Sequence, residues 1–67
     1  MKRVGVLGGG QLARMLCIEG AKMGYEMHVL SLSAEDPAAQ VTRHWHQGDV
    51  NSAYDVKRFF SSVEAQK

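Results

Sequence analysis

The stretch that decides the fold is Val4-Gly5-Val6-Leu7-Gly8-Gly9-Gly10-Gln11-Leu12-Ala13-Arg14-Met15-Leu16. Its apolar start predicts a strand over Arg3–Leu7, and its end predicts a helix from Gly10 to Met23 that stops at Gly24. Three glycines join the two elements. A strand, a glycine turn and a helix start, in this order, form the arrangement that holds a phosphate on backbone N–H groups.

The glycine turn also fits the dinucleotide fingerprint G-x-G-x-x-G/A, as Gly8-x-Gly10-x-x-Ala13. Gly8 permits a tight turn, Gly10 lets an anionic group approach the backbone, and Ala13 lets the helix contact the strand. The alternative is a purely structural strand-to-helix turn without a ligand. We predict a phosphate site formed by the backbone at the helix start.

A nicotinamide dinucleotide would require an acidic residue at the end of the second strand, to hold the ribose hydroxyls. The sequence has Leu30-Ser31-Leu32-Ser33 at that point, and Glu35 and Asp36 come too late, inside a loop. An NAD(P)-binding module of an oxidoreductase is therefore the weaker alternative.

The remaining chain continues an α/β pattern. Strands are expected at Glu26–Leu30 and Arg43–Gln47, and a second helix over Ala53 to Val63, capped by Asn51 or Ser52. The order β-α-β-β-α predicts a partial, Rossmann-like, doubly wound parallel sheet. The continuous apolar character of the first strand predicts a central position, buried on both faces.

Helical periodicity predicts which side chains face the sheet. In the first helix the expected inward positions are Leu12, Leu16, Gly20 and Met23, with Ala13 beside them. In the second helix the apolar stripe is Val56, Phe59, Phe60 and Val63, and part of it lacks a surface to pack on.

Length and composition limit the possible functions. Residues 1–67 form a single domain. Three strands are too few for an independent sheet with both faces covered, so we expect a truncated domain or an obligate oligomer. The 8 basic and 7 acidic residues argue against nucleic-acid binding. No stretch approaches a membrane span, which predicts a cytoplasmic protein without membrane contact.

The histidine and cysteine residues indicate neither a metal site nor a catalytic nucleophile. His44 and His46 share one face of the third strand, but a zinc site needs three or four ligands. We therefore expect these histidines to face solvent, Trp45 to enter the core, and no metal site. Cys17 is expected to be a buried structural thiol, and no catalytic residue is predicted.

The stretch from Val4 to Leu16 resembles the start of N5-carboxyaminoimidazole ribonucleotide synthetases, the ATPase subunits of phosphoribosylaminoimidazole carboxylase. The string Gly-Gly-Gly-Gln-Leu, followed by Arg-Met, is rather specific to this family of ATP-grasp ligases. Further landmarks match in the same order, namely Gly24-Tyr25, Asp36-Pro37-Ala38-Ala39-Gln40 and Gly48-Asp49. The sequence departs from the family near Ser31, where an Asp is usual, and in its polar third strand.

The resemblance implies the doubly wound domain that precedes ATP-grasp domains. The whole enzyme would join bicarbonate to 5-aminoimidazole ribonucleotide in purine biosynthesis, with ATP and Mg²⁺ bound by domains absent from this chain. The chain alone would hold no cofactor and be inactive, and it would form a homodimer or pack against the missing ATP-grasp domains. The substrate phosphate would bind at Gly8, Gly9, Gly10, Gln11 and Leu12. A non-catalytic assembly module is a further alternative.

Overall fold

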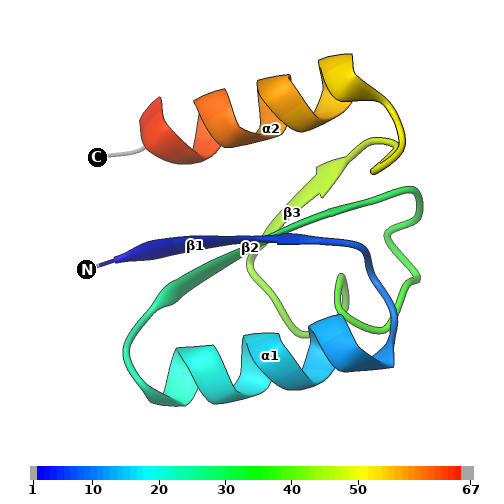
Figure 1. Ribbon diagram of the computed structural model, residues 1–67. Helices are drawn as coiled ribbons and strands as arrows, with labels where there is room; N and C mark the ends of the chain where they lie inside the picture. The colour runs from blue at the N-terminus through cyan, green and yellow to red at the C-terminus, as the bar shows by residue number, and fades with distance from the viewer. Residues whose placement is uncertain (1, 66–67) are drawn as a thin grey trace.

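A parallel sheet lies between two helices, one on each face (Figure 1). The computed structural model describes residues 2–65. Its elements are β1 (Arg3–Leu7), α1 (Gln11–Lys22), β2 (Glu26–Ser31), β3 (His44–Gln47) and α2 (Ala53–Ala65). The predicted α/β class and the order β-α-β-β-α are confirmed. Neither helix in the described part of the chain has the length and apolar character needed to cross a membrane.

The strands are ordered β1-β2-β3, and both neighbouring pairs are parallel. Every residue of β2 after Glu26 is buried, whereas β1 is only half-buried. The prediction of a central β1 is therefore wrong for the described residues. The physical reason is that β2 has a neighbouring strand on each side and a helix over each face, while β1 pairs along one edge only.

α1 packs on the sheet through small side chains, because Ala13, Cys17 and Gly20 are its buried residues. They follow the i, i+4, i+7 spacing that places residues on one helical face. The prediction that the larger side chains face the sheet is wrong. Leu12, Leu16 and Met23 are 71%, 49% and 68% exposed. A Cβ atom at Gly20 would overlap the sulphur of Met27, so the small residues let the helix lie close to β2.

α2 covers the opposite face. Phe59 and Val63 are buried and form a core cluster with Leu30, while Val56 packs against this cluster from one side. Phe60 completes the predicted stripe but remains 41% exposed, although it approaches Gly5 of β1. The amphipathic pattern therefore predicted the helix and its buried core correctly.

The start of α2 is held by side chains, as the sequence suggested. The Ser52 hydroxyl accepts the N–H of Asp55 at 3.2 Å. The Asp55 carboxylate in turn accepts the N–H of Asp49 at 2.9 Å. This is a variant of the capping box in which the returning bond reaches back beyond the cap residue.

The connection between β2 and β3, residues 32–43, contains no helix and lies on the same face as α1. Ala38 is fully buried in the core cluster beneath α1. Its N–H donates to the carbonyl of Gly9 at 2.9 Å, and the Thr42 hydroxyl donates to the carbonyl of Met27 at 2.6 Å. The connection is therefore fastened to the glycine turn at one end and to β2 at the other.

Replacing Gly20 by a branched residue tests the close contact between α1 and β2. We expect Gly20→Val to lower the free energy of unfolding by about 2 kcal/mol, because the new methyl groups overpack against Met27. Urea denaturation followed by circular dichroism measures the change. The matched control is Ala21→Val, next to it on the exposed side of the helix, which should cost less than about 1 kcal/mol. Equal costs for the two variants would contradict the packing described.

Candidate functional site

The glycine turn joins β1 to α1 at the carboxyl ends of the strands. Gly8 has φ of +108°, a conformation that other residues adopt only with strain. Its N–H donates to the carbonyl of Leu30 at 2.9 Å, and the carbonyl of Gly9 accepts the N–H of Ala38. The turn is thus fixed between β2 and the following connection.

The start of α1 presents backbone donors that the helix itself does not use. The first helical bond runs from the N–H of Arg14 to the carbonyl of Gly10, at 2.9 Å. Gly10 is the cap residue, and no side chain caps the helix. The N–H groups of Gln11 and Leu12 therefore have no acceptor within the helix, and the helix dipole adds partial positive charge around them.

A hollow of about 330 Å³ borders this helix start, and Gly8, Gly10, Gln11 and Leu12 are among the residues that line it. Four of the five predicted phosphate-binding residues therefore meet at one hollow. The other lining residues, Val6, Leu7, Ala13 and Leu16, are apolar, and the first helical turn has no acidic side chain, so the polar partners for an anion here are backbone N–H groups.

Gly9, the fifth predicted residue, lines a second hollow of about 200 Å³ on the other side of the turn. Gly8 borders both hollows. Ser31 and Asp36 also line the second one. A Cβ atom at Gly9 would lie 2.7 Å from the Cβ of Asp36 and 2.8 Å from that of Ser31, so this position admits only glycine without rearrangement.

Asp36 is the site residue that the sequence analysis missed. We placed it inside the loop, too late to be the acidic residue at the end of the second strand, but the connection folds back, and Asp36 packs against Gly9. Its carboxylate accepts the N–H of Ser33 at 3.3 Å. The available signal was the parallel order of β2 and β3, which forces the connection to return along the sheet. A carboxylate repels phosphate and accepts hydroxyl groups, so the second hollow suits a sugar hydroxyl.

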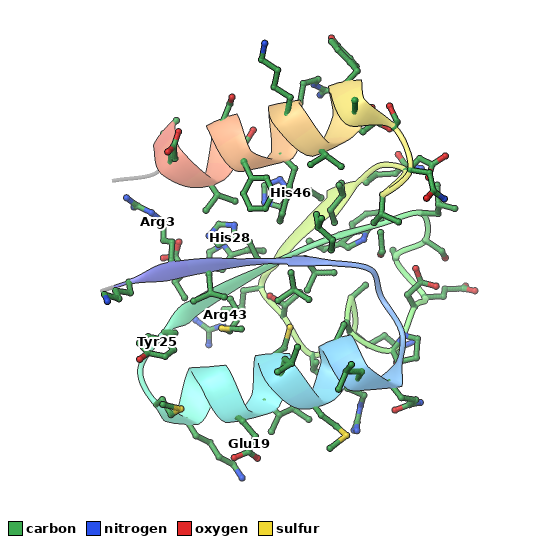
Figure 2. All side chains as sticks on the ribbon, viewed as in Figure 1. Arg3, Glu19, Tyr25, His28, Arg43 and His46 are labelled. Carbon is green, nitrogen blue, oxygen red and sulfur yellow. The ribbon has the colours of Figure 1, made fainter. Side chains whose placement is uncertain are left out.

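The three histidines of the chain form a cluster on the face that α2 covers, and Figure 2 labels two of them, His28 and His46. His28 is fully buried, and its ring stacks on that of His44 with centroids 4.4 Å apart. His46 lies with its Nε2 3.1 Å from Nδ1 of His28. The expectation that His44 and His46 face solvent is therefore wrong for His46, which packs against Phe59 of α2, whereas the His44 side chain is 32% exposed. It failed for His46 because the sequence showed the face that the two histidines share but not the helix above His46.

The histidine cluster contains one carboxylate. Oε2 of Glu26 lies 2.7 Å from Nε2 of His28, and this hydrogen bond is the main reason that the pKa of Glu26 is lowered. The pKa of His46 is also lowered, chiefly by burial and further by the charges of His28 and His44. The carboxylate is therefore ionised, and the His46 ring stays neutral to a lower pH than usual.

Trp45 and Cys17 lie on the opposite face of the sheet, beneath α1. Trp45 is half-buried against the core, as predicted, and its indole N–H donates to the hydroxyl of Ser31 at 2.8 Å. Cys17 is 2% exposed, which confirms the expected buried thiol. Burial raises the pKa of Cys17, so it carries little thiolate at neutral pH.

The fold and the glycine turn define a doubly wound α/β domain of the kind that binds nucleotides at the carboxyl ends of its strands. The family model of the ribonucleotide synthetase preATP-grasp domain matches residues 1–66. The chain belongs to this family.

Relatives and solved structures agree with the family. The chain is 39% identical, over 62 residues, to N5-carboxyaminoimidazole ribonucleotide synthase of Brucella melitensis, covering 92% of this chain and 16% of that protein. It matches the N5-carboxyaminoimidazole ribonucleotide synthetase structure from Thermotoga maritima with a TM-score of 0.85 and 30% identity, over 94% of this chain and 18% of that one. The Staphylococcus aureus enzyme, solved with ADP, gives a TM-score of 0.83 and 27% identity, over 92% and 17% of the two chains.

Substitutions at Gly9 and Gly10 test which of these neighbouring glycines is closely packed and which faces open space. We expect Gly9→Ala to lower the free energy of unfolding by about 2 kcal/mol, because the added Cβ meets Asp36 and Ser31. Gly10→Ala should cost less than about 1 kcal/mol, since nothing lies within 4 Å of a Cβ there and its φ is −79°. Chemical denaturation of both variants measures the difference. A larger loss for Gly10→Ala would contradict this geometry.

The burial of Cys17 predicts slow modification of its thiol. Alkylation by iodoacetamide at pH 8 should be at least about tenfold slower in the folded protein than in guanidinium, because burial both blocks access and disfavours the thiolate. Mass spectrometry of quenched samples gives the two rates. Equal rates would show that Cys17 is accessible.

Proposed function

We propose that this chain forms the part of an ATP-dependent ligase that binds the phosphate of 5-aminoimidazole ribonucleotide, which the complete enzyme carboxylates in purine biosynthesis. The observation that carries this proposal is the set of backbone N–H groups at the start of α1, which have no acceptor within the helix and belong to residues that line a hollow. Membership of the preATP-grasp family supports the choice of ligand over other phosphates.

Each residue of the turn has a distinct role in this proposal. Gly8 and Gly9 shape the turn, because one has positive φ and the other leaves no room for a side chain. The N–H groups of Gly10, Gln11 and Leu12 bind the phosphate oxygens at the positive end of the helix. The Gln11 amide can add a further donor.

Asp36 extends the same site toward the ribose. It borders the hollow on the other side of Gly8, so a ribonucleotide could place its phosphate on α1 and its hydroxyls beside the carboxylate. Charged hydrogen bonds of this kind favour ligands that carry both groups over inorganic phosphate. The site would therefore distinguish a ribonucleotide from phosphate compounds that lack the ribose hydroxyls.

ATP, Mg²⁺ and bicarbonate belong to the complete enzyme in this proposal. The Brucella melitensis relative is about six times longer than the matched region, since the match covers 16% of it. The ADP in the Staphylococcus aureus structure supports the use of ATP by the family. We propose the cytoplasm as the location, and no catalytic residue within this chain.

The edge of β1 that has no partner strand among residues 2–65 is the proposed contact with the rest of the ligase. An unpaired strand edge offers backbone donors and acceptors for a further strand. Leu7, at the end of this strand, is 46% exposed. We propose that a following strand of the same polypeptide covers this edge, as the greater length of the relatives supports.

Kinetics of the natural-length protein test the phosphate site. Gly10→Val fills the space in front of the N–H groups, so we expect KM for 5-aminoimidazole ribonucleotide to rise about tenfold or more. KM for ATP should stay within about twofold, because ATP binds elsewhere. The control is Glu19→Gln, an exposed residue on the same helix. An unchanged KM for the ribonucleotide, or tighter binding of NAD than of the ribonucleotide, would refute the proposal.

A further inference from the structure

Four polar side chains converge on the face of the sheet opposite α1. Glu26 and His28 come from β2, and His44 and His46 from β3, each pair separated by one residue and so directed to the same face. The parallel register sets His28 directly beside His44. All the histidines of the chain therefore gather at one place (Figure 2).

The donor atoms of three of these residues lie close together. Nε2 of His28 is 2.7 Å from Oε2 of Glu26, and Nε2 of His44 is 4.0 Å from Oε1 of the same carboxylate. One donor atom from each residue lies within 4.8 Å of the other two. Tetrahedral zinc, with bonds of about 2.0–2.1 Å, separates its ligand atoms by about 3.3 Å. Small rotations of the side chains therefore bring all three to bonding distance.

We infer that Glu26, His28 and His44 form a binding site for a divalent transition-metal ion of the Zn²⁺ class. Two imidazoles and one carboxylate make the mixed nitrogen and oxygen donor set that such ions prefer over Mg²⁺ or Ca²⁺. The fourth position is left to water. The site shares no residue with the glycine turn, so it does not depend on the proposed ligase function.

Burial across the cluster suits the entry of an ion. The His28 side chain is 0% exposed, whereas those of Glu26 and His44 are 24% and 32% exposed. One ligand is thus fixed in the core, and the other two line a way in from solvent. Because Glu26 and His44 are partly exposed, their side chains can also adjust their rotamers.

His46 acts as a positioning residue for the buried ligand. With metal on Nε2 of His28, the ring proton sits on Nδ1 and is donated to Nε2 of His46, 3.1 Å away. Metal-bound histidines usually donate their second ring N–H to such an acceptor. The edge of the His46 ring packs against Phe59, with ring centroids 5.0 Å apart, so α2 holds this acceptor in place.

Arg3 limits the strength of the site. It is paired in register with Glu26 and lies on the same side of the sheet (Figure 2). Its positive charge acts on the Glu26 carboxylate and repels a cation bound there. We therefore expect Arg3→Gln to tighten binding.

Cobalt titration of the natural-length protein, after removal of any histidine tag, tests the site. We expect one Co²⁺ per chain, a visible d–d absorption band, and displacement of that band by Zn²⁺. His44→Gln and Glu26→Gln change ligands that are partly exposed, so the fold should persist by circular dichroism while affinity falls about tenfold or more. His46→Gln should weaken binding less, because it removes an outer hydrogen bond and no ligand.

Two controls lie outside the cluster. Glu19→Gln removes an exposed carboxylate, and Cys17→Ser removes the thiol on the opposite face of the sheet, and neither should change the affinity. The inference is overturned if no stoichiometric binding occurs, if binding survives both ligand variants unchanged, or if Cys17→Ser abolishes it. Since the readout is metal binding, failure here leaves the ribonucleotide kinetics unaffected, and the converse also holds.

Discussion

The close fit of the glycine turn against β2 and its following connection is the constraint on which the rest of the molecule depends. The N–H of Gly8 is bonded to Leu30, and the carbonyl of Gly9 is bonded to Ala38. These two bonds fix where α1 begins and which way its unpaired N–H groups point. Asp36 packs against the turn at Gly9, in space that a side chain on Gly9 would need. The same contacts thus set the backbone geometry of the glycine turn and decide which residues lie around it.

The alternation of β2 divides the chemistry of the protein between its two faces. Met27 and Val29 face α1 and join its small side chains in an apolar core. Glu26, His28 and Leu30 face α2, where polar groups and the Phe59 cluster share a narrow space. A strand buried on both faces need not be apolar on both, provided that its polar side chains find partners. In the described residues, no buried side-chain nitrogen or oxygen lacks one.

The small size of the described domain explains its unusual surface. A sheet of three strands exposes one edge of β1, and α1 carries large apolar residues outward. In isolation such a surface is a liability, because it offers both hydrogen bonds and apolar area to other chains. Within a longer ligase the same surface would serve as an internal contact. The relatives, which are several times longer than the match, fit that arrangement.

The sequence by itself determined the class of fold, the order of the elements and the position of the glycine turn, because periodicity and glycine placement act locally along the chain. It also pointed to the residues around the start of α1 as a candidate phosphate site. The resemblance that it showed is to the family to which the chain belongs. Only the tertiary structure decided that β2 is central, that Ala13, Cys17 and Gly20 face the sheet, and that Asp36 reaches the turn. The meeting of His28 with His44 likewise depends on strand register, which brings residues distant in sequence together and leaves no local signal.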